Sequence, residues 1–193
     1  MKTTDLIFWS FLLLYIGQGL FAIWLERENL RHLRRFGWRV PKGFEGHIDE
    51  TKLSEISGYT AAKARLGLFR YATAESLTLF LILSGFFPWL DGTVSGVGSI
   101  AGGLLFFMAP GLALYLCELP FDYYNAFVIE GRFGFNRSTL RLWLTDQLKS
   151  GAISFVFLSA LLSAVLFMVG YSPDHWWLCA FGIVSAVQIL LVV

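Results

Sequence analysis

Uncharged apolar blocks, each about as long as a bilayer is thick, constrain the fold of this chain more than any other feature. Residues 6–25 carry no charge, and an α-helix needs roughly 20 such residues to cross the hydrocarbon core. Four further blocks lie at 71–90, where Glu75 is the one charged residue, and at 92–117, 150–173 and 175–193, which carry none. Charged residues make up only 15% of the chain, against about 25% in soluble domains. We expect an all-α polytopic membrane protein with about five transmembrane helices.

The basic residues lie almost entirely in two long polar loops, at 26–70 and 118–149. Ten of the 15 Lys and Arg residues fall in the first loop and four in the second, whereas the other two connections carry only Asp91 and Asp174. Basic loops remain on the cytoplasmic side of a membrane. We therefore expect the N-terminus outside and both loops in the cytoplasm, in the inner membrane of a bacterium or the ER membrane of a eukaryote.

The two ends of the chain also carry information. Lys2 precedes the first apolar block, as in a secretory signal, but Glu26, Arg27 and Glu28 follow it where a signal has small residues. We therefore keep this block as a membrane helix. The last block ends on QILLVV without a polar flank, so we expect residues 1–193 to form the single N-terminal membrane domain of a longer protein.

The first loop contains two helical patterns. Residues 26–36 continue the first helix, with Arg27, Arg31 and Arg35 four apart on one face. This stripe either touches anionic head groups or is a solvated face that follows the positive-inside rule. A second helical pattern begins near Asp49 and leads into the second span.

The second loop is expected to form amphipathic helices at the cytoplasmic surface. Pro120 should stop or kink the helix before it, because proline lacks a backbone N–H. Asn136 or Ser138 is suited to cap the next helix. Residues 140–149 have an apolar stripe opposite charged residues, which is typical of an interfacial amphipathic helix.

The most specific pattern of the sequence is the segment LPFDYYNAFVIEGRFGFNRSTL at 119–140. Glycines at 131 and 134 permit turns that other residues avoid, and are expected to end the helix there. The segment resembles the FVIExxxGFNxxT signature of the integral-membrane CAAX prenyl proteases of type I, which are zinc metallopeptidases. The matching positions are Phe127, Val128, Ile129, Glu130, Gly134, Phe135, Asn136 and Thr139. Taken singly, the aromatic residues fit an interfacial belt equally well.

The resemblance implies that the front and the later parts of the polypeptide have different roles. In that family the front helices wall a chamber, and this loop lies beside the active site. Asn136 would then position the substrate backbone, with Glu130 and Arg132 as supports and Gly134 and Phe135 beside them. The zinc ligands, including an HExxH helix, would follow Val193. The implied partners are the lipid bilayer, the C-terminal catalytic half and a peptide or membrane-protein substrate; in a bacterium, membrane or misfolded polypeptides are more plausible than prenylated ones.

No zinc site is expected within residues 1–193 themselves. His32, His47 and His175 are far apart in sequence and none forms an HExxH pair. His47, two residues before Asp49, is expected to belong to a polar turn. Cys117 and Cys179 both lie in apolar blocks, so no disulfide framework is implied. The sequence also lacks a phosphate loop, a nucleophile elbow and a basic-aromatic surface for nucleic acid.

Two other functional classes remain open. Glu75 lies within the second block, where a charge is by default a functional candidate, although its position five residues after Arg70 favours a place near the interface. Glu75 and the third block, loosened at Pro110, are the features that favour a small transporter component. A non-catalytic membrane scaffold or binding protein would use the same helices without a protease half.

Overall fold

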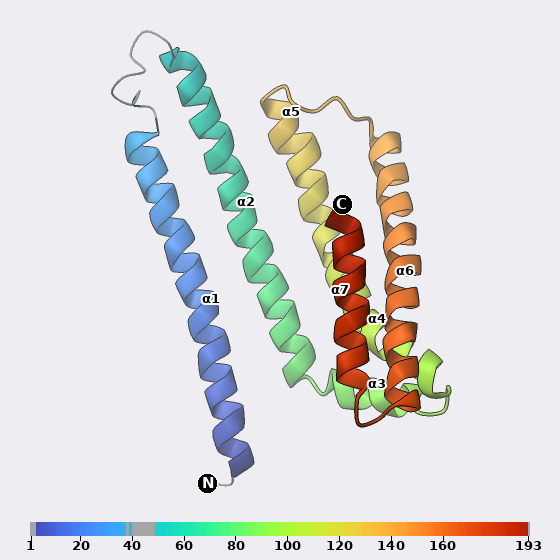
Figure 1. The fold of residues 1–193 in the computed structure, drawn as a ribbon. Coiled ribbons are helices and arrows are strands. Elements are labelled where there is room, and N and C mark those ends of the chain that lie inside the picture. The colour runs from blue at the N-terminus through green and yellow to red at the C-terminus, as the bar shows by residue number, and fades with distance from the viewer. Residues whose placement is uncertain (1–2, 38, 40–48, 193) are drawn as a thin grey trace. The chain divides into compact units, whose positions relative to one another are not determined.

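The protein is almost entirely helical in the part that the computed structural model describes, residues 3–37, 39 and 49–192. The elements are α1 (Thr3–Phe36), α2 (Glu50–Leu83), α3 (Phe86–Val94), α4 (Ser99–Tyr123), the π-helix η1 (Tyr124–Ile129), α5 (Glu130–Arg132), α6 (Leu140–Tyr171) and α7 (Trp176–Val192) (Figure 1). Among the described residues, four segments are long and apolar enough to cross a membrane: Asp5–Phe36, Thr51–Leu83, Ser99–Arg132 and Leu140–Tyr171. Trp176–Leu190 is a shorter apolar helix. The expected all-α polytopic class is confirmed.

The long helices expose most of their apolar side chains. Leu13 and Leu14 of α1 are 73% and 70% exposed, and Leu148 and Ile153 of α6 are 74% and 70% exposed. A helix of a soluble domain would bury such residues in a stripe against its neighbours. In a membrane the lipid tails are as apolar as leucine, so exposed leucine carries no penalty. The exposed faces are therefore what helices surrounded by lipid require.

One compact unit comprises residues 1–80 and 114–137, with α1, most of α2, the end of α4, η1 and α5. The Tyr15 hydroxyl of α1 donates a hydrogen bond to the backbone carbonyl of Glu75 in α2, at 3.3 Å. Arg70 of α2 forms ion pairs with Glu118 and with Asp122, the latter at 2.9 Å. These contacts join α2 to α1 on one side and to α4 on the other, as Figure 1 shows.

The second unit comprises residues 81–113 and 138–193, with α3, the first part of α4, α6 and α7. Close approach of α4 and α6 depends on a glycine, because a Cβ at Gly103 would lie 2.7 Å from a methyl group of Leu166. The Ser159 hydroxyl of α6 contacts the Met108 sulfur of α4 at 3.4 Å. Small residues commonly permit this kind of approach between membrane helices.

The apolar block at 71–90 is divided between two helices. α2 ends at Leu83 and α3 begins at Phe86, whereas the sequence predicts one span over 71–90. Gly85 lies between them with φ +77°, a left-handed conformation that glycine adopts without steric cost. Hydropathy does not reveal this break, because the residues on both sides of Gly85 are apolar.

The second loop differs from expectation at three points. α4 continues through Pro120 to Tyr123, because proline removes one N–H donor and a membrane helix tolerates that loss. α6 runs unbroken from Leu140 to Tyr171, so the expected separate interfacial helix over 140–149 is wrong. The N-cap of α6 is Thr139, whose hydroxyl accepts a hydrogen bond from the Leu142 amide at 3.3 Å. The caps expected at Asn136 or Ser138 are therefore wrong.

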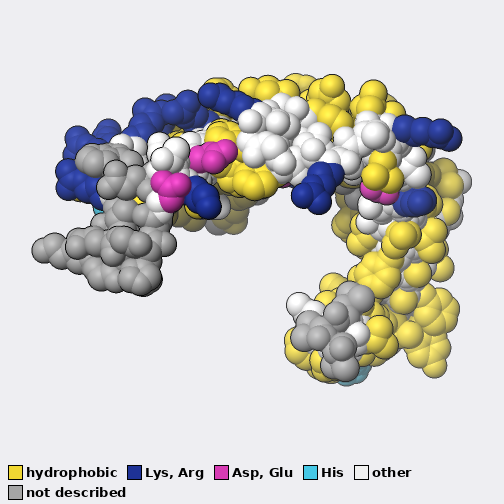
Figure 2. All heavy atoms as spheres, turned by 90° about the horizontal axis from the view of Figure 1, so that it is seen from above, with side chains coloured by type: hydrophobic (Ala, Val, Ile, Leu, Met, Phe, Trp, Pro, Cys, Tyr) yellow, Lys and Arg dark blue, Asp and Glu magenta, His cyan; other side chains and the backbone are white. Residues whose placement is uncertain are grey.

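The two ends of α1 and α2 that we expect on the cytoplasmic side, the C-terminal end of α1 and the N-terminal end of α2, are helical. α1 extends through its basic stripe to Phe36, and Figure 2 shows Lys and Arg side chains gathered around this end of the helix. Asp49 precedes α2, and its carboxylate accepts a hydrogen bond from the Thr51 amide at 2.9 Å. That bond lowers the pKa of Asp49, since it favours the charged form.

Candidate functional site

The chain changes its helical geometry immediately before the motif loop. η1 is a π-helix over Tyr124–Ile129, and α5 adds Glu130–Arg132. A π-helix inserts an extra residue into the turn and occurs frequently at functional sites. Glu130 therefore does not have the orientation that an uninterrupted α-helix would give it, and the sequence pattern contains no signal of this change.

A hydrogen-bonded turn centred on the Glu130 carbonyl ends the helix. The amides of Phe135 and Asn136 both donate to this carbonyl, at 2.8 Å and 3.1 Å. Gly134 just before them has φ +74°, the left-handed conformation that is usual at a helix C-terminus. Gly131, in contrast, lies inside α5, and its φ is not in that range. The expectation that both glycines end the helix holds only for Gly134.

Among the described residues, two side chains make polar contacts with the Glu130 carboxylate. Its Oε1 atom accepts a hydrogen bond from the Asn125 amide group at 3.0 Å. The same oxygen lies 3.7 Å from the Lys63 ammonium of α2, and the Glu130 side chain is 28% exposed. The carboxylate thus joins η1, α5 and α2. The sequence alone does not identify either partner of Glu130, although Lys63 lies four residues after Tyr59, a spacing at which side chains meet on a helix.

Tyr59 connects the loop to α2 through its aromatic ring. The ring lies edge-on to Phe133 at 5.4 Å and to Phe135 at 5.0 Å between centroids, geometries that aromatic pairs favour. The Lys63 ammonium donates a hydrogen bond to the Tyr59 hydroxyl at 3.1 Å. The loop is therefore held against α2 in two ways. Lys63 contacts Glu130 by charge, and the Tyr59 ring packs on Phe133 and Phe135.

Four of the five loop residues singled out from the sequence surround this turn directly. Glu130 supplies the carbonyl, Gly134 the left-handed residue, and Phe135 and Asn136 the two donors. Asn136 is half-buried and Phe135 is 58% exposed. Arg132, the fifth, lies over the Phe133 ring at 5.7 Å.

Glu75 is not part of this site. It lies twelve residues after Lys63 on α2, which corresponds to about 18 Å along a helix. Its backbone carbonyl accepts the hydrogen bond from Tyr15 of α1. The structure therefore separates the intramembrane carboxyl from the loop.

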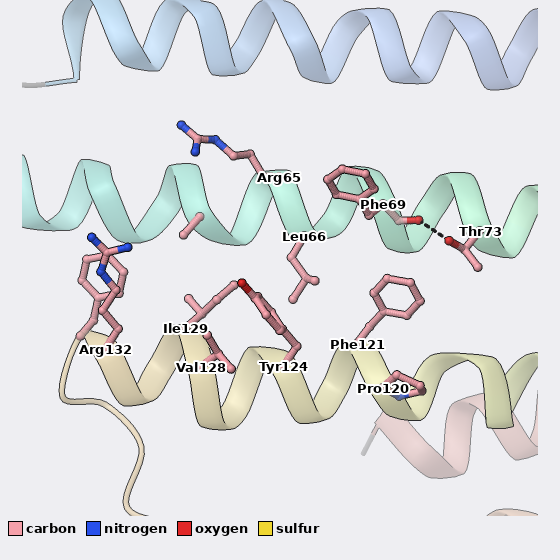
Figure 3. Close-up of a pocket in the computed structure, with 12 residues that line it drawn as sticks. Arg65, Leu66, Phe69, Thr73, Pro120, Phe121, Tyr124, Val128, Ile129 and Arg132 are labelled. Atoms are coloured by element: carbon pink, nitrogen blue, oxygen red, sulfur yellow. Dashed lines mark hydrogen bonds between the residues drawn. The ribbon is translucent and has the colours of Figure 1, made fainter.

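A groove of about 550 Å³ lies next to this site, between α2 and the continuous segment α4–η1–α5 (Figure 3). Its lining is mostly apolar, with Leu66 and Phe69 on one wall and Phe121 and Val128 on the other. Ligand sites of proteins commonly have this volume and this apolar lining.

The described residues do not offer a fitting set of metal ligands. Within residues 3–37, 39 and 49–192 no three His, Cys, Asp or Glu side chains come together closely enough to hold a metal ion. His32 packs its ring against Phe36 at 4.7 Å, and His47 lies outside the described residues.

Known proteins match this sequence and this fold. Residues 29–193 match the model of the CAAX prenyl protease N-terminal family, described as having five membrane helices. CAAX prenyl protease 1 of Saccharomyces cerevisiae is 29% identical over 166 residues, which cover 79% of this chain and 36% of that protein. The human CAAX prenyl protease 1 homolog is 24% identical over 174 residues, covering 86% and 37%. The crystal structure of S. mikatae Ste24p superposes with a TM-score of 0.80 at 27% identity, covering 91% of this chain and 42% of that one.

These matches agree with the resemblance carried by the loop. The chain spans about a third of the length of the relatives named above, and the family model covers more than half of the chain. The protein is an integral membrane protein, and the chain belongs to the CAAX prenyl protease family, whose N-terminal membrane part it matches.

Proposed function

We propose that this chain is the chamber-forming membrane part of a zinc metalloendopeptidase, in which the loop Glu130–Asn136 positions a peptide substrate. The relatives named above are CAAX prenyl proteases, which favours peptide-bond hydrolysis over a transporter or a scaffold. The catalytic zinc and its ligands then belong to the part of the polypeptide that follows Val193. That part would be the main partner of this chain, beside the bilayer and the substrate.

The observation that carries this proposal is the rigid placement of Asn136. Its backbone amide is held on the Glu130 carbonyl, and the Glu130 side chain is held by Asn125 and Lys63. A carboxamide offers two donors and an acceptor, which suits the backbone of an extended peptide. A positioning residue must itself be fixed, because a small displacement of substrate lowers the rate strongly.

Glu130 and Arg132 are supports of this arrangement. The Glu130 carbonyl orders Phe135 and Asn136 directly. Arg132 covers the Phe133 ring, which itself packs on Tyr59. Both residues would thus act on the substrate through the shape of the loop.

The metal requirement tests the proposed reaction. The full-length protein, purified in detergent, is expected to cleave a prenylated peptide and to lose cleavage after chelation, with recovery on adding zinc. Residues 1–193 alone should show neither cleavage nor stoichiometric zinc, because the described residues have no fitting ligand set. Cleavage by the full-length protein that persists after complete metal removal would contradict a metallopeptidase, and one tightly held zinc per 1–193 chain would contradict the assignment of its ligands.

Orientation in the membrane is a separate prediction. The uneven placement of Lys and Arg favours cytoplasmic positions for 26–70 and 118–149. In a background lacking Cys117 and Cys179, Asp91→Cys should react with an impermeant maleimide added outside intact cells, and Glu45→Cys should react only after permeabilisation. Position 45 lies outside the described residues, so its side of the membrane is predicted from charge alone. Equal labelling of both positions from outside would contradict this orientation.

A further inference from the structure

The π-helix η1 changes which side chains share a face with Glu130. The Glu130 amide donates its backbone hydrogen bond to the carbonyl of Asn125, five positions earlier. Residues five positions apart in an α-helix lie about 140° apart around the axis, whereas a turn closed over five residues brings them to the same side. The Asn125 side chain reaches the Glu130 carboxylate, at 3.0 Å. This side-chain contact therefore depends on the π-helical form of the segment.

Ion pairs to α2 lie on both sides of η1. Before η1, Asp122 pairs with Arg70 at 2.9 Å, and Glu118, one turn earlier, pairs with the same guanidinium. After η1, Glu130 lies 3.7 Å from the Lys63 ammonium. Figure 3 shows α2 and the segment α4–η1–α5 side by side over this stretch. The π-helix thus lies between two points at which the chain is fixed to α2.

The spacings of the two pairs match when the segment contains one extra residue. Lys63 and Arg70 are seven positions apart in an α-helix, which brings them within about 20° of the same face. Asp122 and Glu130 are eight positions apart, and in an uninterrupted α-helix they would lie about 80° apart. The residue that a π-turn inserts takes up this difference, because eight positions then advance the chain by the rotation of about seven. Both carboxylates can therefore face α2 at once.

We propose that Lys63 and Arg70 hold η1 in its π-helical form, and that this form directs the motif loop toward the substrate. Relaxation of η1 to an α-helix would rotate Glu130 and the turn that follows it by about 100°, the angle of one α-helical residue. Asn136 would move with this turn, because its amide is bonded to the Glu130 carbonyl. Lys63 is therefore a positioning residue that acts through Glu130. The effect on cleavage rests on the proposed function of the loop, whereas the hold on η1 does not.

Peptide cleavage by the full-length protein tests the effect on the reaction. Lys63→Met is expected to lower kcat/KM by about fivefold, the upper range for an ion pair as exposed as this one. Lys63→Arg retains the charge and should stay close to the wild type. Lys52→Met removes a lysine from the exposed first turn of α2 and should leave cleavage unchanged.

Deletion of Ala126 tests whether the extra residue is what the ion pairs hold. The deletion leaves Asp122 and Glu130 seven positions apart, so an ordinary α-helix aligns both carboxylates with α2. The deletion variant should therefore cleave peptide at a rate close to that of the wild type. Adding Lys63→Met to the deletion should cause no further loss, because an α-helix needs no anchor to keep this alignment.

Cross-linking measures the hold on η1 without reference to cleavage. The Tyr59 and Phe135 rings meet at 5.0 Å between centroids. In full-length protein that lacks Cys117 and Cys179, a short bis-maleimide should therefore join Tyr59→Cys to Phe135→Cys. Adding Lys63→Met should lower the yield of this cross-link, since the loop turns away from α2.

The Ala126 deletion should restore the cross-link in the presence of Lys63→Met. An unchanged cross-linking yield in Lys63→Met would overturn the proposal, and so would a folded deletion variant that leaves the yield low. If the deletion variant does not fold, the comparison of Lys63→Met with Lys63→Arg decides by itself, and equal yields would overturn the proposal. A lower yield with unchanged cleavage would support the hold on η1 and contradict the proposed function of the loop.

Discussion

Asn136→Ala in the full-length protein is expected to lower kcat/KM for peptide cleavage by about 10- to 100-fold. Loss of one or two hydrogen bonds to the substrate, at about 1 kcal/mol each or somewhat more for a fully used amide, accounts for this range. Zinc content and the melting temperature should remain near those of the wild type. Asn136→Asp and Asn136→Ser should also impair cleavage, because neither side chain offers the two N–H donors and the acceptor of a carboxamide.

Thr139→Ala provides the matched control for Asn136. The structure assigns the α6 N-cap to Thr139, whose hydroxyl accepts from the Leu142 amide. Removing that cap should cost about 1 kcal/mol of stability while leaving kcat/KM close to that of the wild type. Peptide cleavage and thermal melts of all four variants separate the two roles. Wild-type activity in Asn136→Asp or Asn136→Ser would show that the amide does not contact substrate.

Gly134→Val is expected to disrupt the motif loop and to abolish most of the cleavage activity. Gly134 has φ +74°, and a β-branched residue there costs on the order of 1–3 kcal/mol or forces the turn to rearrange. The amides of Phe135 and Asn136 would then lose the Glu130 carbonyl. Hydrogen exchange should show this directly, as faster exchange at residues 135 and 136, alongside the cleavage assay.

Two further variants show whether backbone conformation is the cause. Gly134→Asn should recover part of the activity, because asparagine tolerates the left-handed region better than other side chains. Gly131→Ala should be close to wild type, since Gly131 is inside α5 and a Cβ there meets no described atom within 4 Å. If Gly134→Val cleaved peptide and protected both amides as the wild type does, the turn would not be needed for positioning.

The length and composition of the apolar blocks were sufficient to determine the class of the fold. A block such as 6–25 has no charged residue, and a helix satisfies all its backbone hydrogen bonds internally, so it is the structure that such a block adopts in lipid. The local sequence also located the motif loop. Its family resemblance depends on residues that are close together in the chain, from Phe127 to Thr139, and such patterns are readable without a structure.

The structural features that could not be predicted from the sequence depend on contacts between distant residues or on single backbone angles. Glu130 meets Lys63, which is 67 positions earlier, and periodicity does not say which face of α2 will contact η1 and α5. The division of the second apolar block at Gly85 depends on one φ angle, while both flanks are equally apolar. The π-helix likewise redirects Glu130 toward Asn125.

The sequence by itself determined that the chain forms membrane helices and where its specific loop lies, because hydropathy and a short motif are local properties. Only the tertiary structure decided that Tyr59 and Lys63 hold this loop. It also decided that Glu75 lies with Tyr15, away from the loop, and that ion pairs to α2 lie on both sides of η1. The physical reason is that helix pairing selects one face of each helix, and the free energy of that choice is a sum over side chains far apart in sequence.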